Sequence, residues 1–223
     1  MADLPSNIQK INDIEVSADA PISESLLAKM GANINALIDY MNSAKFVVFK
    51  SNGLFLVPNN VQAVLLVGCV GGSGGHFGGN FGGTGTGGLG APLGVTIVPV
   101  VPGATYPITI GAGGSGGTRD SQPGLGGNTT FGSLVTFYGA APDREGSLTS
   151  SQKTVFHNGT GSFRDGGPGP FGPGGLGGGP GQNGAAAPPN SGAGGGGGGS
   201  ATGAFDWYAG GAGGSGILYV VLL

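Results

Sequence analysis

The stretch Gly71-Gly72-Ser73-Gly74-Gly75-His76-Phe77-Gly78-Gly79-Asn80-Phe81-Gly82-Gly83 decides how this chain folds. Its glycines come in pairs at steps near three, which matches the three residues per turn of a polyproline-II-type helix. Pairs at this step leave one ridge of side chains and two faces of bare backbone. Bare faces let neighbouring helices approach closely enough for hydrogen bonds between peptide groups and for Cα–H···O contacts. The stretch therefore predicts packed helices of the polyglycine II type.

Similar spacing recurs along the second half of the chain. Glycine-rich stretches occupy Gly71–Gly94, Gly111–Gly132 and Gly166–Gly216. Within the last of these, Gly194–Gly199 has no side chain for six residues, so we expect it at the centre of the packed helices. The alternative is a flexible linker, but linkers are built from glycine and serine with few aromatic residues, whereas these stretches carry Phe, Trp, Tyr, Asn and Pro.

The overall composition excludes several classes of protein. The 223 residues include 54 glycines and 15 prolines, only 9% are charged, and the net charge is −3. A disordered chain normally stays solvated through charge, and a nucleic-acid-binding protein needs a basic surface, so neither class fits. The single cysteine, Cys69, excludes an internal disulfide framework. The N-terminal residues do not read as a secretory signal, and the longest apolar run, Ala63 to Val70, is too short to cross a bilayer, so we expect synthesis in a cytoplasm and no membrane insertion.

Charge and glycine divide the chain into two unlike parts. Ten of the nineteen charged residues lie in the first 50, whereas only Gly31 and Gly53 precede residue 68. We therefore expect an attachment region at residues 1–44 and a glycine-rich β domain at 45–223. An irregular arm up to Asp19 is followed by a helix over Ser23 to Asn42. Five apolar residues of this helix are spaced 3, 4, 3 and 4, and this stripe predicts a short, parallel, trimeric coiled coil, with packing on its own domain as the alternative: Leu27, Met30, Ile34, Leu37 and Met41.

The β domain should contain one hairpin and several separate strands. Lys45 to Pro58 reads as a hairpin because Asn52-Gly53 lies between two apolar runs. The other strand-like runs are Val61–Val67, Val95–Val101, Tyr106–Ile110, Leu134–Tyr138 and Gly216–Leu223. Aliphatic strands at both edges of the glycine-rich region predict a closed unit whose two ends meet in one sheet. The fold class is therefore mostly β and irregular, with an N-terminal helix and packed glycine-rich loops on a small β-sheet domain.

No motif in the sequence predicts catalysis, a metal site or a cofactor. Gly85–Gly90 matches a dinucleotide-binding pattern, but it does not directly follow a strand, and no helix can run through Ala91-Pro92-Leu93-Gly94 after it. Two Gly-Gly-Ser-Gly-Gly runs match the letters of a nucleophile elbow, yet glycine pairs forbid the helix that an elbow requires. His76 and His157 have no ligand-type residue at a suitable spacing. The acids Asp143, Glu145, Asp165 and Asp206 read as solvated turns rather than as a glycosidase pair.

The remaining signal is a set of aromatic and polar residues at the middles of the glycine-rich loops. A loop that leaves the sheet and returns has its midpoint at the far tip, where rigid aromatic rings with polar neighbours suit contact with a partner. The alternative is that the rings hold the loops together, and Trp207 and Tyr208 lean towards this alternative because they precede the last strand closely. The candidate receptor-binding residues are His76, Phe77, Asn80, Phe81, Arg119, Asp120, Gln122, Phe171, Trp207 and Tyr208.

Three segments together resemble a known family. They are the valine-rich strand that runs into paired glycines at 63–72, the run Pro102-Gly103-Ala104-Thr105-Tyr106-Pro107-Ile108-Thr109-Ile110-Gly111-Ala112-Gly113-Gly114, and Phe131-Gly132-Ser133-Leu134-Val135. Residues 46–223 resemble the glycine-rich C-terminal domain of phage and prophage tail-fibre proteins and the tail-fibre tip adhesins built on a polyglycine II sandwich. The loops here differ in being richer in Pro and Ala, as at Ala185–Pro189.

The resemblance implies a non-enzymatic adhesin at the tip of a phage-like tail fibre. Its expected partners are further copies of itself in a homotrimer, an upstream fibre or tail protein, and a bacterial surface receptor, either an outer-membrane protein or a glycan. Its expected location is the virion or a phage-like fibre tip. Two alternatives remain: a structural fibre component without its own receptor, and an ice-binding protein that presents regular Thr or Ala ridges.

Overall fold

The described residues of the computed structural model, 24–42, 46–79, 83–139, 154–155, 164–203 and 206–223, form one helix and eleven strands. Their contacts divide the chain into two units, Met1–Lys45 and Phe46–Leu223. The part of the chain that the structure describes is thus mostly β with one helix. The elements are α1 (Glu24–Asn42), β1 (Phe46–Phe49), β2 (Gly53–Leu56), β3 (Ala63–Cys69), β4 (Gly78–Gly79), β5 (Leu93–Pro99), β6 (Thr105–Thr109), β7 (Thr129–Phe131), β8 (Val135–Phe137), β9 (Thr154–Val155), β10 (Trp207–Tyr208) and β11 (Ile217–Leu222).

The first unit contains α1, which begins and ends within one residue of the helix predicted from the apolar spacing. Three residues of its apolar stripe, Leu27, Met30 and Ile34, are exposed, whereas Leu26 is buried. Leu37 and Met41 belong to the helix, but their side chains lie outside the described part of the structure.

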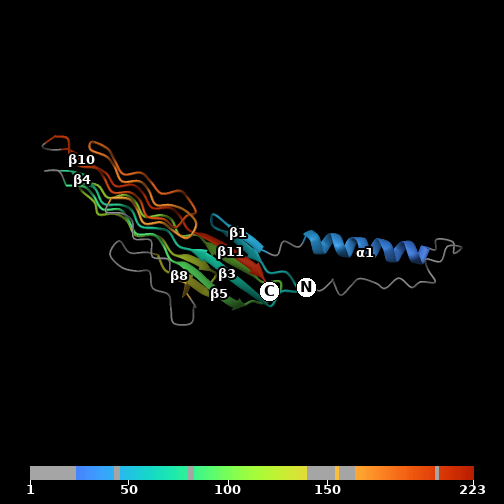
Figure 1. Ribbon diagram of the computed structural model, residues 1–223. Coiled ribbons are helices and arrows are strands. Elements are labelled where there is room, and N and C mark those ends of the chain that lie inside the picture. Colours follow the sequence, from blue (N-terminus) through green and yellow to red (C-terminus); the bar gives the residue numbers. More distant parts are fainter. Residues whose placement is uncertain (1–23, 43–45, 80–82, 140–153, 156–163, 204–205) are drawn as a thin grey trace. The chain divides into compact units, whose positions relative to one another are not determined.

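The second unit is built on two antiparallel sheets. Sheet A has the order β1-β11-β3-β5-β9, and sheet B has the order β2-β6-β7-β8. The strand predictions at both ends of the glycine-rich region are confirmed, because β11, close to the end of the chain, pairs with β1 and with β3 (Figure 1). One core lies between the sheets, with Leu66 and Leu218 from sheet A and Ile108 and Phe131 from sheet B among its buried residues. Alternate positions of each strand supply it, as the two-residue period of a strand requires.

The predicted hairpin over Lys45 to Pro58 is wrong. β1 pairs with β11 in sheet A, and β2 pairs with β6 in sheet B, so the chain crosses between the sheets over residues 50–52. Gly53 is not in a positive-φ conformation, and the side-chain oxygen of Asn52 instead accepts a hydrogen bond from the backbone N–H of Ile110 (2.8 Å). Pairing with the longer strands β6 and β11 leaves the rings of Phe49 and Phe55 facing each other at the core, with their centroids 6.4 Å apart.

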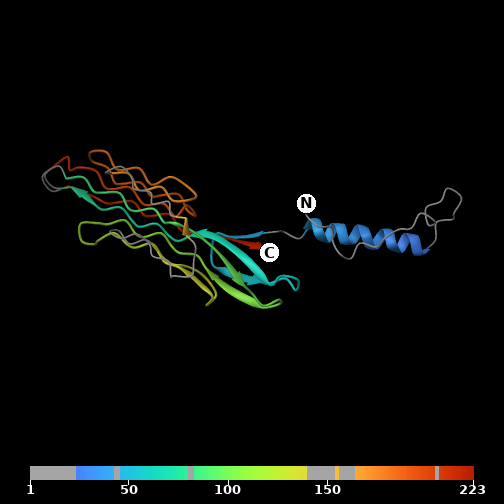
Figure 2. The ribbon, with the colours of Figure 1, turned by 60° about the horizontal axis from the view of Figure 1, so that its bottom comes forward.

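The glycine-rich segments form a third layer that extends away from the sheets. We call it the glycine bundle: residues 70–79, 83–92, 110–128, 164–203 and 206–216. Its segments run side by side in both views (Figure 1, Figure 2). Successive residues bond to different neighbouring segments, and the same neighbour returns three residues later. The N–H groups of Gly71 and Gly74 donate to Gly127 and Gly124, those of Gly72 and Gly75 to Gly214 and Gly211, and those of Ser73 and His76 to Leu89 and Thr86.

Gly194–Gly199 lies at the centre of the bundle, which confirms that prediction. The segment 191–200 exchanges backbone hydrogen bonds with six surrounding stretches: 70–79, 83–92, 164–170, 172–179, 182–190 and 206–216. All six glycines are buried. A Cβ atom at any of them would meet a backbone carbonyl group of another segment at a distance that real Cβ atoms do not adopt. Neighbouring segments therefore approach closely only because these side chains are absent.

Candidate recognition surface at the end of the glycine bundle

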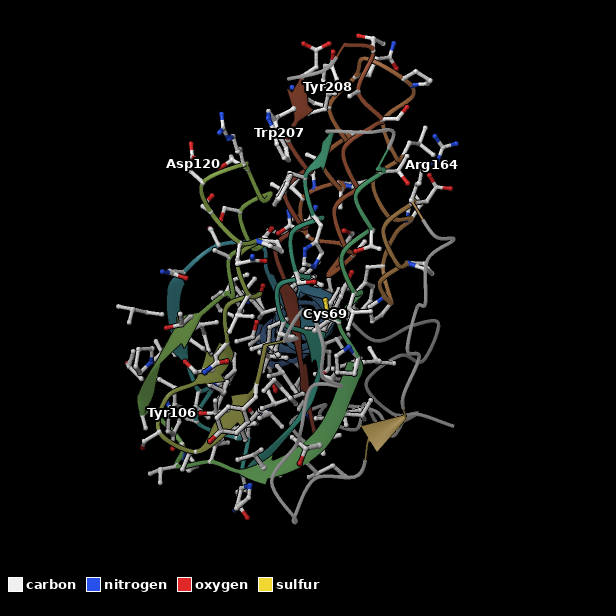
Figure 3. All side chains as sticks on the ribbon, turned by 90° about the vertical axis from the view of Figure 1, so that its left-hand side faces the viewer. Cys69, Tyr106, Asp120, Arg164, Trp207 and Tyr208 are labelled. Carbon is white, nitrogen blue, oxygen red and sulfur yellow. The ribbon has the colours of Figure 1, made fainter. Side chains whose placement is uncertain are left out.

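The end of the bundle that lies farthest from the sheets is formed by β4, β10 and the turns near residues 118–122, 179–182 and 200–203. We call it the distal end. β4 and β10 form a two-stranded sheet in which Trp207 pairs with Gly79 and Tyr208 with Gly78. Gly79 has a φ of 146°, and a Cβ there would meet Trp207. Figure 3 shows Trp207, Tyr208, Asp120 and Arg164 towards this end and Tyr106 at the other.

Trp207 contacts two of the other predicted residues at the distal end. The ring of Phe77 lies 5.5 Å from it, centroid to centroid, at an interplanar angle of 55°. The guanidinium carbon of Arg119 lies 5.5 Å from the centroid of the indole ring, a cation–π contact. Phe77 and Trp207 are half-buried, whereas Arg119 is exposed. The three side chains come from three segments of the bundle, so their contacts hold those segments together at the surface.

The turn that carries Arg119 is fixed by its own hydrogen bonds. The backbone N–H groups of Thr118 and Ser121 each donate to the other residue's carbonyl oxygen (2.9 and 3.3 Å), and the two hydroxyls lie 2.8 Å apart. The N–H of Asp120 also donates to the Thr118 hydroxyl (3.3 Å). Arg119, Asp120 and Gln122 are all exposed on this turn. It therefore presents a cation, a carboxylate and an amide on a defined backbone.

A second polar group lies beside β10. The Thr202 hydroxyl donates to Asp206 Oδ2 (3.0 Å), and the Tyr208 hydroxyl lies 3.4 Å from the same oxygen and 3.3 Å from the Thr202 hydroxyl. Sequence reasoning did not find Thr202 and interpreted Asp206 as a solvated turn. The position of Thr202 and Asp206 in the sequence could have indicated this group, since both residues lie where the chain turns between the central segment 191–200 and the returning segment 206–216.

The other predicted residues have different positions. His76 is half-buried, and its backbone donates to Thr86 and accepts from Gly198, so its main chain belongs to the bundle. Asn80 and Phe81 lie outside the described residues. Placing Phe171 at a far tip was wrong: its ring lies 5.5 Å from that of Tyr219 in β11. The stretch 164–190 runs towards the sheets and turns back at 169–172, then runs to the distal end, turns again near 179–182 and returns. Phe171 therefore lies in the turn next to the sheets.

Metal-ligand clusters and the one thiol were considered among the described residues as possible centres of chemistry. No group of three His, Cys, Asp or Glu among them could hold a metal ion. The Cys69 thiol is buried beneath the bundle, and this burial raises its pKa from 9.0 to about 12, although a backbone hydrogen bond with Ile217 acts in the opposite direction. Such a thiol is a poor nucleophile. The described helix α1 lacks the combination of length and apolar character that spanning a membrane requires.

What the distal end does bring together is one exposed turn, one half-buried aromatic pair and one hydroxyl–carboxylate group, all on a backbone held by hydrogen bonds. These groups can form hydrogen bonds, charge contacts and stacking contacts without rearranging. No family model matches the sequence, and a search of curated proteins gave no match.

Proposed function

We propose that this protein is a non-enzymatic adhesin at the tip of a phage-like tail fibre and that it binds a bacterial surface protein or glycan through the distal end of the glycine bundle. One observation carries the proposal: a hydrogen-bonded bundle centred on Gly194–Gly199 holds aromatic and charged side chains at the end farthest from the sheets. A rigid, preformed surface loses little conformational entropy on binding.

The bundle segments are, in this proposal, polyglycine II helices. The return of the same hydrogen-bonded neighbour after three residues supports this, because that helix has three residues per turn. Ordering each glycine costs roughly 1–2 kcal/mol. Each backbone hydrogen bond contributes only about 1 kcal/mol net, so a single pair of segments would not stay ordered. Six neighbours around one central segment supply the extra bonds and close-packed contacts.

The first unit has the attachment role in this proposal. The exposed apolar side chains of Leu27, Met30 and Ile34 support a parallel, trimeric coiled coil built on α1. The arm before it would engage an upstream fibre or tail protein. The protein would then reside in a virion or a phage-like fibre, with three copies of the adhesin domain and avidity for a dense cell surface.

Two alternatives each have an observation in their favour. The contacts of Trp207 with Phe77 and Arg119 would suit a structural fibre component whose rings only hold the segments together. Exposed Ala112, Ser115 and Thr118, at three-residue intervals on one segment, would suit an ice-binding face. Thermal hysteresis of a solution of the protein would support the ice-binding alternative.

The test of the adhesin uses the exposed turn, because the hydrogen bonds that fix its backbone come from Thr118, Ser121 and the N–H of Asp120 and are kept when the side chains at 119, 120 and 122 are removed. In the full chain, Arg119, Asp120 and Gln122 are all replaced by Ala, which leaves the net charge unchanged. Binding of fluorescently labelled protein to a panel of bacteria is measured by flow cytometry. We expect binding to at least one strain, with an affinity at least tenfold lower for the triple variant, about 1.4 kcal/mol of binding free energy. Protease-treated cells and glycan-stripped cells then distinguish the two receptor classes.

A matched control removes three exposed amide side chains from the opposite end of the domain. Asn59, Asn60 and Gln62 are exposed on the connection between β2 and β3. Their replacement by Ala should leave cell binding unchanged. A wild-type protein that binds no strain contradicts the adhesin, and equal loss of binding in both triple variants contradicts the assignment of the distal end.

A further inference from the structure

Among the described residues, the outer face of sheet A, which points away from sheet B, carries apolar side chains and Tyr219. The residues of this face pair with one another across neighbouring strands. In each strand the residues before and after them point to the other side, towards the core. Cys69, Leu93 and Ile217 form the row of this face nearest to the bundle, and the rows farther from it hold Phe46, Val48, Ala63, Leu65, Val67, Val95, Ile97, Pro99, Tyr219, Val221 and Leu223.

Such a face is unusual for an antiparallel sheet in water. A sheet with one solvated face normally alternates apolar and polar residues, and a sheet that is apolar on both sides is normally covered on both. The side chain of Phe46 is nevertheless 54% exposed, and that of Ile97 is 65% exposed. Contiguous exposed apolar surface of this kind marks an interaction site.

The bundle covers only the end of this face nearest to it. There the ring of Phe171 contacts Tyr219, and a Cβ at Gly192 would meet the sulfur of Cys69. Phe46 contacts the same tyrosine with its ring centroid 6.5 Å away, and it remains exposed. The uncovered part therefore begins at Phe46 and extends across β11 and β3 to Ile97.

The chemistry of the face favours another copy of this chain as its partner. No Asp, Glu, Lys or Arg occurs between Ser51 and Thr118 or after Asp206, so β3, β5 and β11 lie in charge-free sequence. Interfaces between different, transient partners are about as polar as ordinary surface, whereas permanent interfaces between identical chains are more apolar.

A second apolar surface lies close by in the sequence. α1 exposes Leu27, Met30 and Ile34, and it ends three residues before β1 begins. The four Cα–Cα steps from Asn42 to Phe46 span at most about 14 Å. Where α1 helices of several copies associate in parallel, their β1 strands are consequently drawn towards the same axis.

We propose that the outer face of sheet A packs against a second copy of this chain. This inference rests on the self-association of α1 in the proposed function and adds a second contact to it. Receptor binding by the distal end is a separate property, so a chain that fails to associate through sheet A can still bind cells.

The test compares Ile97→Lys with Leu54→Lys in the full chain by sedimentation velocity. Leu54 is 71% exposed on the outer face of sheet B and is the matched control. We expect an oligomer for the wild type and for Leu54→Lys, and at least a tenfold weaker association for Ile97→Lys. Far-UV circular dichroism checks that both variants fold. A monomeric wild type overturns the proposal and leaves a different protein, or the N-terminal arm of this chain, as the cover.

A second measurement separates the sheet contact from the helix contact. Ile97→Cys introduces a thiol, whereas Cys69 is buried, so a short bismaleimide should cross-link copies through position 97 only. Leu54→Cys should give no cross-linked species. Ile34→Asp tests α1 in the same way by sedimentation. An oligomer that dissociates with Ile34→Asp but tolerates Ile97→Lys, with no cross-linking at position 97, overturns the sheet contact and leaves the coiled coil intact.

Discussion

For single residues of the bundle, the absence of a side chain allows neighbouring backbone segments to pack in direct contact. Gly196 is buried in the central segment, and a Cβ there would meet the carbonyl group of Leu176. Gly179, at the end of an outer segment, would place a Cβ near only the flexible side chain of Gln182, 3.3 Å from its oxygen. The two glycines are therefore chemically identical and differ only in what surrounds them.

This difference gives a direct prediction for Gly196→Ala. The new methyl group forces backbone apart, so we expect the free energy of unfolding to fall by at least about 2 kcal/mol. Gly179→Ala, as the control, should change it by less than about 0.5 kcal/mol. Guanidinium unfolding followed by circular dichroism measures both. Equal effects of the two substitutions would contradict close backbone packing at Gly196.

The raised pKa of the buried Cys69 thiol predicts that the stability of the fold depends on pH. Burial raises its pKa from 9.0 to about 12 in the folded chain. Between these values the unfolded chain has released the proton and the folded chain retains it, so stability falls as pH rises. The contribution is fully present below pH 9 and is lost towards pH 12. Against Cys69→Ala, the wild type should lose up to about 1.4 kcal/mol more per pH unit in this range.

Denaturant unfolding at pH 7, 9, 10 and 11 provides that comparison. Other groups titrate in the same range, but they are common to both proteins and cancel in the difference. Parallel curves for the two proteins would show that the thiol ionises equally easily in the folded and unfolded chains.

Among the elements, the segment 191–200 forms backbone hydrogen bonds with six surrounding segments, whereas a central strand of a sheet forms them with two. Its amide groups donate to four different surrounding segments, so no single local opening frees them all. Local stability of this kind is read out by hydrogen exchange.

We expect the amides of 194–199 to exchange as slowly as those of β3 and β11. Mass spectrometry of peptic peptides at pH 7 measures this, and peptides from the exposed turn 118–122 are the fast-exchanging internal reference. Exchange of 194–199 at the rate of a free peptide would contradict both the ordered bundle and the recognition surface that depends on it.

In the domain as a whole, the two packed sheets and the glycine bundle depend on each other. β3, β6 and β11 continue directly into bundle segments, so the sheets set the starting positions of the segments. Contacts at the boundary, such as the Thr129 hydroxyl donating to the Cys69 carbonyl (2.9 Å), join sheet A to sheet B beneath the bundle. The proposed recognition surface is thus positioned by a core that lies at the other end of the domain.

Much of this arrangement follows from the sequence alone. The spacing of apolar residues determines α1, the aliphatic runs determine β3, β5, β6, β8 and β11, and the six consecutive glycines determine the centre of the bundle. These features are local: a period or an absent side chain acts wherever the segment lies. No local pattern predicts that β1 and β2 belong to different sheets, that Phe171 lies against Tyr219, or that Trp207 contacts Arg119 and Phe77. Those outcomes depend on which distant segments compete for the same partner, and that competition is resolved by total burial and hydrogen bonding rather than by any local pattern.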